Sequence, residues 1–463
     1  MKKYLLLFCF ILSYSTYGQL DNPEELSFEE YLGFVKLFHP IAKQANLKIE
    51  EGQANLMKAR GGFDPKLEVD YNRKDFKSKD YYNLFNATFK VPTWYGIDVK
   101  ANFEENSGDF LNPQNSVPNN GLFTAGVSAS LGQGLFINER MATLKKARFF
   151  NNQTKAERDL MANNIVFEAA LAYFDWVQAF NETEMFKRFL SNAKIRFEGV
   201  RESVLAGDKA GIDSLEANIN INNRALALEQ SKVKLMKNTL MVSNFLWLDN
   251  DVPLEINPNV NPKPLEKSEV DSVLQLEELV EFNAEAHPKL IALDSKISGL
   301  TVDKRLKANK LLPKVDVQYN FITQDPDIGN SFNTSNYKAG LNVAFPLFLR
   351  KERGDLKLAK IKIEATKFER TNTSLSLKNK VEALKRELES YITQNEIIAE
   401  VVKDYETLLE AEERKFSFGE SSVFLINYRE SSLIDAQLKQ LKLRNKFYHT
   451  KAKLFNSLGT VLN

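Results

Sequence analysis

The sequence predicts an α+β fold in which one unit of short β-strands and very long helices is used twice. Pairs of residues return at a constant offset of 248 residues (288 − 40): His39-Pro40 as His287-Pro288, Pro65-Lys66 as Pro313-Lys314, and Tyr71-Asn72 as Tyr319-Asn320. A second set returns at an offset of 212 residues (419 − 207): Leu135-Phe136 as Leu347-Phe348, Ala147 as Ala359, and Gly207 as Gly419. Such constant offsets indicate an internal duplication. We therefore expect a first repeat at 19–248 and a second at 272–463, with a proline-containing linker at 249–271.

The N-terminal residues and the composition indicate an exported protein. Residues 1–18 combine two lysines with an apolar run, as a cleavable secretory signal peptide does. Cys9, the only cysteine, lies within this predicted signal. The 62 Lys+Arg balance the 61 Asp+Glu, which gives no general attraction to nucleic acid. No later stretch approaches the ~18 apolar residues of a membrane-spanning helix, so we expect any membrane insertion to occur without helices.

Segments in which apolar and polar residues alternate predict β-strands. The first half has four such segments, starting near Leu67, Phe85, Ile97 and Phe123; the second half has two, starting near Val315 and Tyr337. The two offsets differ by 36 residues (248 − 212), enough for an additional hairpin in the first half. One apolar and one polar face suit a transmembrane β-barrel with lipid outside and water inside. A soluble sandwich with its apolar face inward is the alternative.

Each strand region leads into an unusually long helical stretch. Residues 138–206 contain no proline and only Gly199 as glycine, and the stretch after Gly354 contains neither as far as 418. Such helices would be roughly 100 Å long, and apolar spacings of three and four predict coiled-coil packing. Both stretches end at a glycine, Gly207 or Gly419, and a second helical stretch follows. We therefore expect a long helical hairpin in each half, with its tip at the glycine. Short helices at 26–38 and 39–60 precede the first strand.

The strands of one chain are too few to close a barrel, because the smallest bacterial barrels use about 8. The pattern therefore predicts a cyclic homo-oligomer that shares one barrel. Two aromatic pairs, Tyr81-Tyr82 and Trp94-Tyr95, would form an interfacial girdle of such a barrel or be ordinary strand aromatics.

The duplicated order of elements resembles the TolC-type outer membrane efflux protein family, the outer membrane factors of tripartite export systems. The best local signatures are the tip segments, RFEGVRESVLAGDKAGIDSLEA from Arg196 and RKFSFGESSVFLINYRES from Arg414, and the resemblance covers nearly the whole mature chain. It implies a homotrimer with one shared β-barrel in the outer membrane, continued into the periplasm by an α-helical coiled-coil barrel. The family usually has twelve strands. The additional hairpin therefore either changes this count or lies outside the barrel wall.

The resemblance implies a passive function. The trimer would be a channel-tunnel that conducts substrates, in efflux or type I secretion, across the periplasm and the outer membrane. Its partners would be a periplasmic adaptor (membrane fusion protein), an inner-membrane transporter and outer membrane lipid, without nucleic acid. A periplasmic coiled-coil scaffold or adaptor without a pore is the alternative. The sequence leaves the exported substrate and the pump class open.

We expect neither an enzyme nor a cofactor or metal site. The sequence has three histidines, His39, His287 and His449, and no cysteine after the predicted signal, which leaves few nucleophile-base or metal-ligand sets. Two of these histidines directly precede a proline at equivalent positions. The residue before proline avoids helical angles, so a role at the start of a helix explains them.

The resemblance places the functional residues at the glycine tips. It implies an adaptor contact at Gly207, Asp208, Gly419 and Glu420, and a pore constriction at Asp213, Glu216 and Leu425. Asp213 falls at an acidic position of the family, whereas its counterpart 212 residues later is Leu425, so an acidic ring would be at best half present. For Asp208 and Glu420, the alternative is a carboxylate at the start of a helix, stabilised by the helix dipole.

Overall fold

The computed structural model describes residues 24–276, 282–324 and 333–460. The predicted signal peptide with Cys9 lies outside these residues. The chain divides into two compact units, and both halves of the sequence contribute to each. We call them the sheet unit (Val35–Glu168, Asp271–Gln394 and Lys446–Asn463) and the hairpin unit (Met1–Phe34, Ala169–Val270 and Asn395–Asn445). Among the described residues, no helix combines the length and the apolar character needed to cross a membrane.

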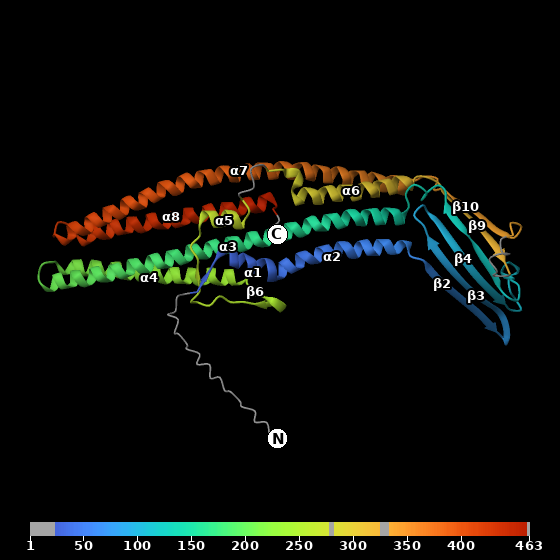
Figure 1. Cartoon of the computed structure of the whole chain (residues 1–463), viewed down its shortest axis with the longest axis horizontal. Helices are drawn as coiled ribbons and strands as arrows, with labels where there is room; N and C mark the ends of the chain where they lie inside the picture. The colour runs from blue at the N-terminus through green and yellow to red at the C-terminus, as the bar shows by residue number, and fades with distance from the viewer. Residues whose placement is uncertain (1–23, 277–281, 325–332, 461–463) are drawn as a thin grey trace, which may run out of the picture. The chain divides into compact units, whose positions relative to one another are not determined.

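The sheet unit contains one six-stranded antiparallel sheet (Figure 1). Its strands, in spatial order, are β10 (Tyr337–Ala344), β9 (Lys314–Thr323), β5 (Leu122–Ser130), β4 (Ile97–Ser107), β3 (Lys79–Pro92) and β2 (Lys66–Phe76). All six segments predicted from alternation are therefore strands. The additional hairpin, β3–β4, lies within the sheet between β2 and β5, where its strands pair along their length. It is a full part of the sheet and not an appendage beside it.

The register gives the sheet one apolar and one polar face. Odd-numbered residues pair with odd and even with even, except beyond the β-bulge between Lys74 and Asp75 of β2. Val99, for example, lies opposite Val127, and Asp98 lies opposite Ser128. Since successive side chains point to opposite faces, the odd-numbered apolar residues of six strands share one face. Many of them are exposed, including Leu67 (70 %) and Leu341 (69 %). The predicted alternation is confirmed.

Four helical segments of the sheet unit form a layer in the same order as the strands. They are α2 (Pro40–Arg60), the start of α3 (Glu139–Leu205), α6 (Pro288–Asn309) and the start of α7 (Arg350–Ser417). Ala59 of α2 packs on α3 in one apolar cluster. Lys146 of α3 pairs with Asp303 of α6 at 3.3 Å, and Lys307 of α6 pairs with Asp355 of α7 at 3.5 Å. The layer therefore runs α2–α3–α6–α7.

Both His-Pro pairs begin a helix, as expected. His39 and His287 have extended backbones (ψ 132° and 130°), and each imidazole accepts a hydrogen bond from the backbone N–H two residues on, at Ile41 (3.2 Å) and Lys289 (3.1 Å). The helices then start at the proline, which needs no N–H partner. Burial lowers the pKa of His287 to about 4, and Lys289 and Lys380 add to this shift.

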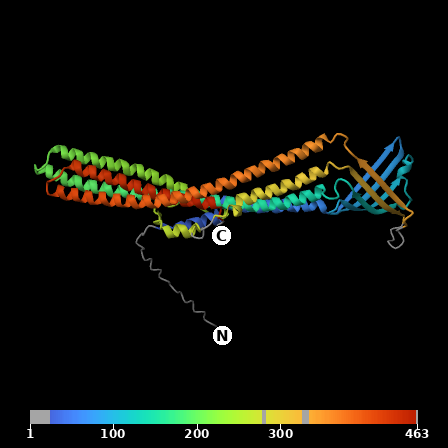
Figure 2. The ribbon, with the colours of Figure 1, turned by 90° about the horizontal axis from the view of Figure 1, so that it is seen from above.

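The hairpin unit contains four long helical segments that lie side by side (Figures 1 and 2). They are the second part of α3, α4 (Gly211–Ser243), the second part of α7, and most of α8 (Val423–Leu458). Met185 and Phe189 of α3 pack against Val402 and Leu409 of α7 and Ile426 of α8. The two long hairpins predicted from the sequence thus share one apolar core.

The predicted linker carries short elements that are fixed to the hairpin unit. Parallel pairing joins β8 (Asn261–Pro262) to β1 (Glu25–Leu26), and Arg444 of α8 donates a hydrogen bond to the carbonyl of Leu265 at 2.7 Å. The other short elements of the linker are η3 (Asp249–Asp251), β7 (Val252–Pro253) and α5 (Lys267–Val273), which continues beyond it. Elsewhere in the chain the short elements are α1 (Phe28–Phe38), η1 (Gly61–Phe63), η2 (Pro113–Asn115), β6 (Trp247–Leu248) and η4 (Ala284–Ala286).

Candidate functional site

The first helix of each hairpin, α3 or α7, ends in the same glycine turn. Gly207 and Gly419 have positive φ values of 87° and 80°. At the first turn, Gly207 N–H donates to Val204 O (3.1 Å) and Asp208 N–H donates to Ser203 O (2.9 Å). The second turn repeats the two bonds, from Gly419 and Glu420, at 3.0 Å each. This pair of bonds is the Schellman motif, which satisfies the last carbonyls of a helix.

The glycine requirement at these turns is conformational and not steric. A Cβ atom added at Gly207 or Gly419 would meet no described atom within 4 Å. The left-handed backbone is nevertheless costly for a residue with a Cβ, and glycine avoids this cost. Both predicted tips therefore have the backbone that the two glycines suggested, while their role in docking an adaptor stays a prediction.

The return helices, α4 and α8, which follow the two glycine turns, start differently. Ser422 precedes α8, and its hydroxyl accepts a hydrogen bond from Leu425 N–H at 3.3 Å. The neighbouring Ser421 donates to Glu412 at 2.6 Å and thereby lowers the pKa of that carboxyl. At the start of α4, by contrast, the preceding Ala210 supplies no side-chain cap within the described chain.

The predicted site residues lie around these turns. Asp208 and Glu420 are exposed and lie three residues ahead of α4 and α8, outside the first turn of either helix. Both residues belong to the glycine turns, in which their backbone N–H groups donate to carbonyls of the preceding helix. Asp213 does lie in the first turn of α4, half-buried, and Leu425 is 38 % exposed near the start of α8. Glu216 accepts a hydrogen bond from the Asn427 amide at 3.4 Å, which joins α4 to α8.

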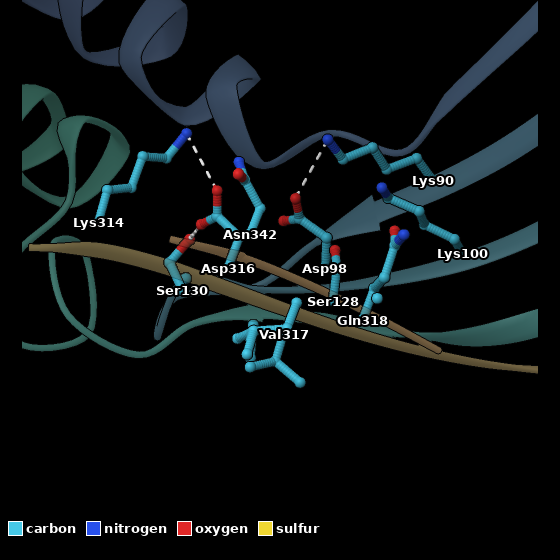
Figure 3. Close-up of a pocket in the computed structure, with 14 residues that line it drawn as sticks. Lys90, Asp98, Lys100, Ser128, Ser130, Lys314, Asp316, Val317, Gln318 and Asn342 are labelled. Carbon is cyan, nitrogen blue, oxygen red and sulfur yellow. Dashed lines mark hydrogen bonds and ion pairs between the residues drawn. The ribbon is translucent and has the colours of Figure 1, made fainter. Parts of the chain in front are cut away.

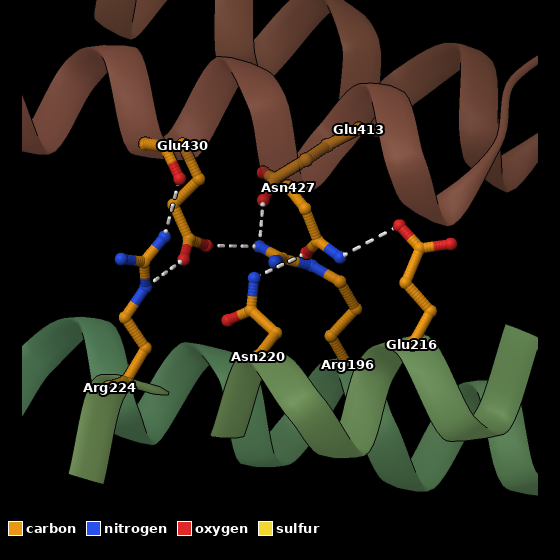
Figure 4. Close-up of polar contacts among 8 residues, drawn as sticks. Arg196, Glu216, Asn220, Arg224, Glu413, Asn427 and Glu430 are labelled. Carbon is orange, nitrogen blue, oxygen red and sulfur yellow. Dashed lines mark hydrogen bonds and ion pairs between the residues drawn. The ribbon is translucent and has the colours of Figure 1, made fainter. Parts of the chain in front are cut away.

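A buried charged cluster ties the two hairpins together close to the turns (Figure 4). Glu430 of α8 is 1 % exposed and pairs with Arg196 of α3 at 2.7 Å and Arg224 of α4 at 3.0 Å. Arg196 also reaches Glu413 of α7 at 3.1 Å. Beside them, Asn220 donates to Asn427 at 2.7 Å. One carboxylate thus holds side chains from two other helices, and all four helices contribute to the cluster.

Sequence reasoning did not identify this cluster. Its signal is the spacing in α8, where Glu430 continues the apolar series Val423, Ile426 and Leu433 at steps of three and four. A carboxylate at a core position of a helical hairpin needs a buried cationic partner. That partner is distant in sequence, and its identity could not be inferred from the spacing alone.

The polar face of the sheet carries a second group of charges (Figure 3). A cavity of about 490 Å³ is lined by Lys90, Asp98, Lys100, Asp316 and Asn342, among other residues. Asp98 pairs with Lys90 at 3.1 Å and with Arg140 of α3 at 2.8 Å. Asp316 pairs with Lys314 at 3.1 Å and accepts a hydrogen bond from Ser130 at 2.6 Å. Alternating cations and anions make this face hydrophilic.

Aromatic residues lie toward both ends of β3. Tyr81, near the start of the strand, packs against Phe110 with ring centroids 4.7 Å apart. Trp94 follows the end of the strand and stacks on Phe63 at 5.5 Å. This placement suits the predicted interfacial girdle, which stays a prediction.

Comparison with known families finds a match in the second half of the chain. Residues 288–460 match the model of the outer membrane efflux protein family. The second half of the chain is therefore similar to this family of outer membrane channels, which confirms the resemblance predicted from the sequence. Comparison with curated proteins finds no match.

Solved outer membrane channels share the fold over nearly the whole chain. The Campylobacter jejuni CmeC outer membrane channel is 12 % identical with a TM-score of 0.65, covering 93 % of this chain and 85 % of that one. The Neisseria gonorrhoeae MtrE outer membrane channel, in its open state, is 14 % identical with a TM-score of 0.65 (93 % and 88 % covered). The outer membrane protein VceC of Vibrio cholerae is 11 % identical with a TM-score of 0.65 (93 % and 95 %). These likenesses show the fold.

Proposed function

We propose that this protein is a homotrimeric channel-tunnel of the outer membrane that conducts substrates passively. The sheets of three copies would form one barrel in the membrane, and the helices would continue it into the periplasm. An inner-membrane transporter would supply the energy and select the substrate, and a periplasmic adaptor would join it to the channel. The two predicted repeats would then supply equivalent parts of one protomer.

The exposed apolar face of the sheet carries this proposal. Residues on this face of β2 and β10 are 55–70 % exposed, as at Val69 and Leu341. A soluble sandwich would cover such a face with a second layer, and no such layer occurs in the described part of the chain. Contiguous apolar surface of this kind marks contact with lipid or with another protein. The opposite face, with its paired charges, suits water.

The hairpin unit supports the remainder of the proposal. Its turn residues, Gly207, Asp208, Gly419 and Glu420, are exposed and available to an adaptor. Asp213, Glu216 and Leu425 follow within the first two turns of the return helices, where we propose the pore constriction. Three copies of Asp213 around one axis would repel one another and attract cations.

The test is the location and state of the expressed full-length protein. Membrane fractionation, followed by native mass measurement in detergent, should give a trimer from the outer membrane whose electrophoretic migration changes on heating. A soluble periplasmic protein would instead indicate the scaffold or adaptor alternative. A detergent-extracted monomer would contradict the shared barrel.

A further inference from the structure

We infer that copies of this chain join through strand β10 of one and strand β2 of the next, with the β3–β4 hairpin inside the wall. A trimer would then have an eighteen-stranded barrel, not the twelve strands that the resemblance implies. This inference rests on the proposed trimeric channel and specifies how its wall is closed.

Within the described chain, neither edge strand of the sheet has a neighbouring strand on its outer side. β2 is hydrogen-bonded only to β3, and β10 only to β9. All eleven residues of β2 are exposed, and seven of the eight residues of β10 are exposed, all but Gly340. Edge strands with unpaired backbone groups are templates for another strand. In a membrane their pairing is required, because lipid offers no hydrogen bonds.

Strand direction makes the two edges compatible. All five pairings of the sheet are antiparallel, so the first and sixth strands run in opposite directions. A β10–β2 pair between copies therefore continues the antiparallel pattern without a break. It also keeps the odd-numbered apolar residues on one face, provided that odd residues again pair with odd.

The helical layer presents the same two edges. Helix α2 leads through the short helix η1 into β2, and β10 leads into α7, so the α2–α3–α6–α7 layer begins and ends where the sheet does. The free edge of α7 carries a seam of exposed apolar residues at Leu358, Ile361, Phe368 and Leu375, with exposures of 53–72 %. Spacings of three and seven along this seam are those of a coiled coil. On α2, Leu47 (56 %) and Met57 (70 %) are exposed and offer a partner surface.

Two different edges that fit one another generate a ring of copies. Contacts of this head-to-tail kind close when the rotation per copy divides a full turn. One chain cannot close its own sheet, because six strands fall below the roughly 8 of the smallest barrels. The occupant of each edge is therefore a second copy of this chain.

The width of the sheet matches that of the helical layer only with the inserted hairpin. Three copies of four helices, at ~10 Å spacing, make a ring roughly 120 Å around. Eighteen strands, at ~4.8 Å spacing and ~40° tilt, make a ring of roughly 110 Å, whereas twelve make roughly 75 Å. The β3–β4 hairpin thus allows the sheet to continue the helical layer without a large change in width.

Engineered cysteine pairs test the closure directly. The only native cysteine is Cys9, in the predicted signal. We would combine Leu341→Cys with a cysteine at each odd-numbered position of β2 from 67 to 73, before the β-bulge, in the full-length protein in outer membranes. At least one pair should give disulfide-linked dimers and trimers on non-reducing gels. The matched control, Ala87→Cys with Leu341→Cys, places the second cysteine on the inner strand β3 and should give none.

Other outcomes separate this inference from the channel proposal. A trimer from the outer membrane that cross-links at none of the four positions, or only within one chain, overturns the β10–β2 contact and leaves the channel in place. Electron cryomicroscopy of that trimer should show eighteen strands down the three-fold axis, and twelve would equally overturn the inference. A monomer, or a protein absent from the outer membrane, would instead contradict the proposed function itself.

Discussion

The two glycine turns share one backbone and differ in chemistry. Gly207 and Gly419 have nearly equal φ values and the same pair of hydrogen bonds. After the first turn, α4 carries Asp213 and lacks a side-chain cap, whereas α8 has Ser422 as its cap and Leu425 in place of the aspartate. The backbone is thus constrained in both hairpins, while the side chains beyond the turn are not. A difference in function between the hairpins would therefore reside in these side chains.

The largest expected effect comes from the contact that joins the two hairpins. Glu430→Leu would leave Arg196 and Arg224 without their buried carboxylate. Removing one partner of a buried ion pair typically costs about 3–5 kcal/mol. Hydrogen exchange should therefore increase at both glycine turns together, and the midpoint of thermal unfolding should fall.

The matched control is Glu413→Leu, which removes the second carboxylate partner of Arg196. Glu413 is 46 % exposed, so its loss should cost less than about 1 kcal/mol. If both variants had equal effects, the burial of Glu430 would not be the reason for its importance, and the two hairpins would be less coupled than we infer.

The second expected effect concerns His287, which caps the start of helix α6. In the folded state the pKa of His287 is about 4, below the ~6.5 of an unperturbed histidine, so the unfolded chain takes up the proton first. The free energy of unfolding should therefore decrease as pH falls from 6.5 to 4, by about 3 kcal/mol at most, and this loss should be complete below pH 4. Denaturant unfolding across this pH range measures it.

His287→Asn separates this effect from other titrations. Asparagine can cap a helix but does not titrate. The variant should show a shallower loss of stability between pH 6.5 and 4 than the parent protein. Identical pH profiles for the two proteins would exclude His287 as the titrating group.

The third effect tests whether the two turns are equivalent. Gly207→Val and Gly419→Val should each cost about 1–2 kcal/mol, because valine disfavours positive φ and no neighbouring atom adds a steric term. Membrane insertion should persist while docking of the adaptor is impaired. Gly199→Val, within α3 and without nearby atoms, should be close to neutral. Normal export by the Gly419→Val variant would count against the docking role.

Local patterns predicted most of the fold. The strands, the His-Pro helix starts and the glycine turns follow from side-chain period and backbone preference, which neighbouring residues determine. The sequence did not resolve whether β3–β4 joins the sheet, because pairing with β2 and β5 depends on the register of a completed sheet. It did not reveal the Arg196–Glu430–Arg224 cluster either, since its members meet only after the hairpins pack.

The smallest effect on stability is expected at Asp213, where the first turn differs most from the second. An exposed or half-exposed carboxylate contributes little to folding, so Asp213→Asn should leave the trimer intact. If three Asp213 carboxylates line the constriction, the variant should lose cation preference and become less sensitive to block by trivalent cations. The parent's block should itself be weaker than that of a double acidic ring, because Leu425 supplies no charge.

Single-channel recording in planar bilayers tests the channel itself. The purified protein should insert as discrete, long-lived conducting units that prefer cations, and Asp213→Asn should conduct with a reduced preference. An Asp213→Asn channel with the parent's selectivity and block would remove this residue from the constriction. Trimeric protein from the outer membrane that never conducts would contradict the account as a whole.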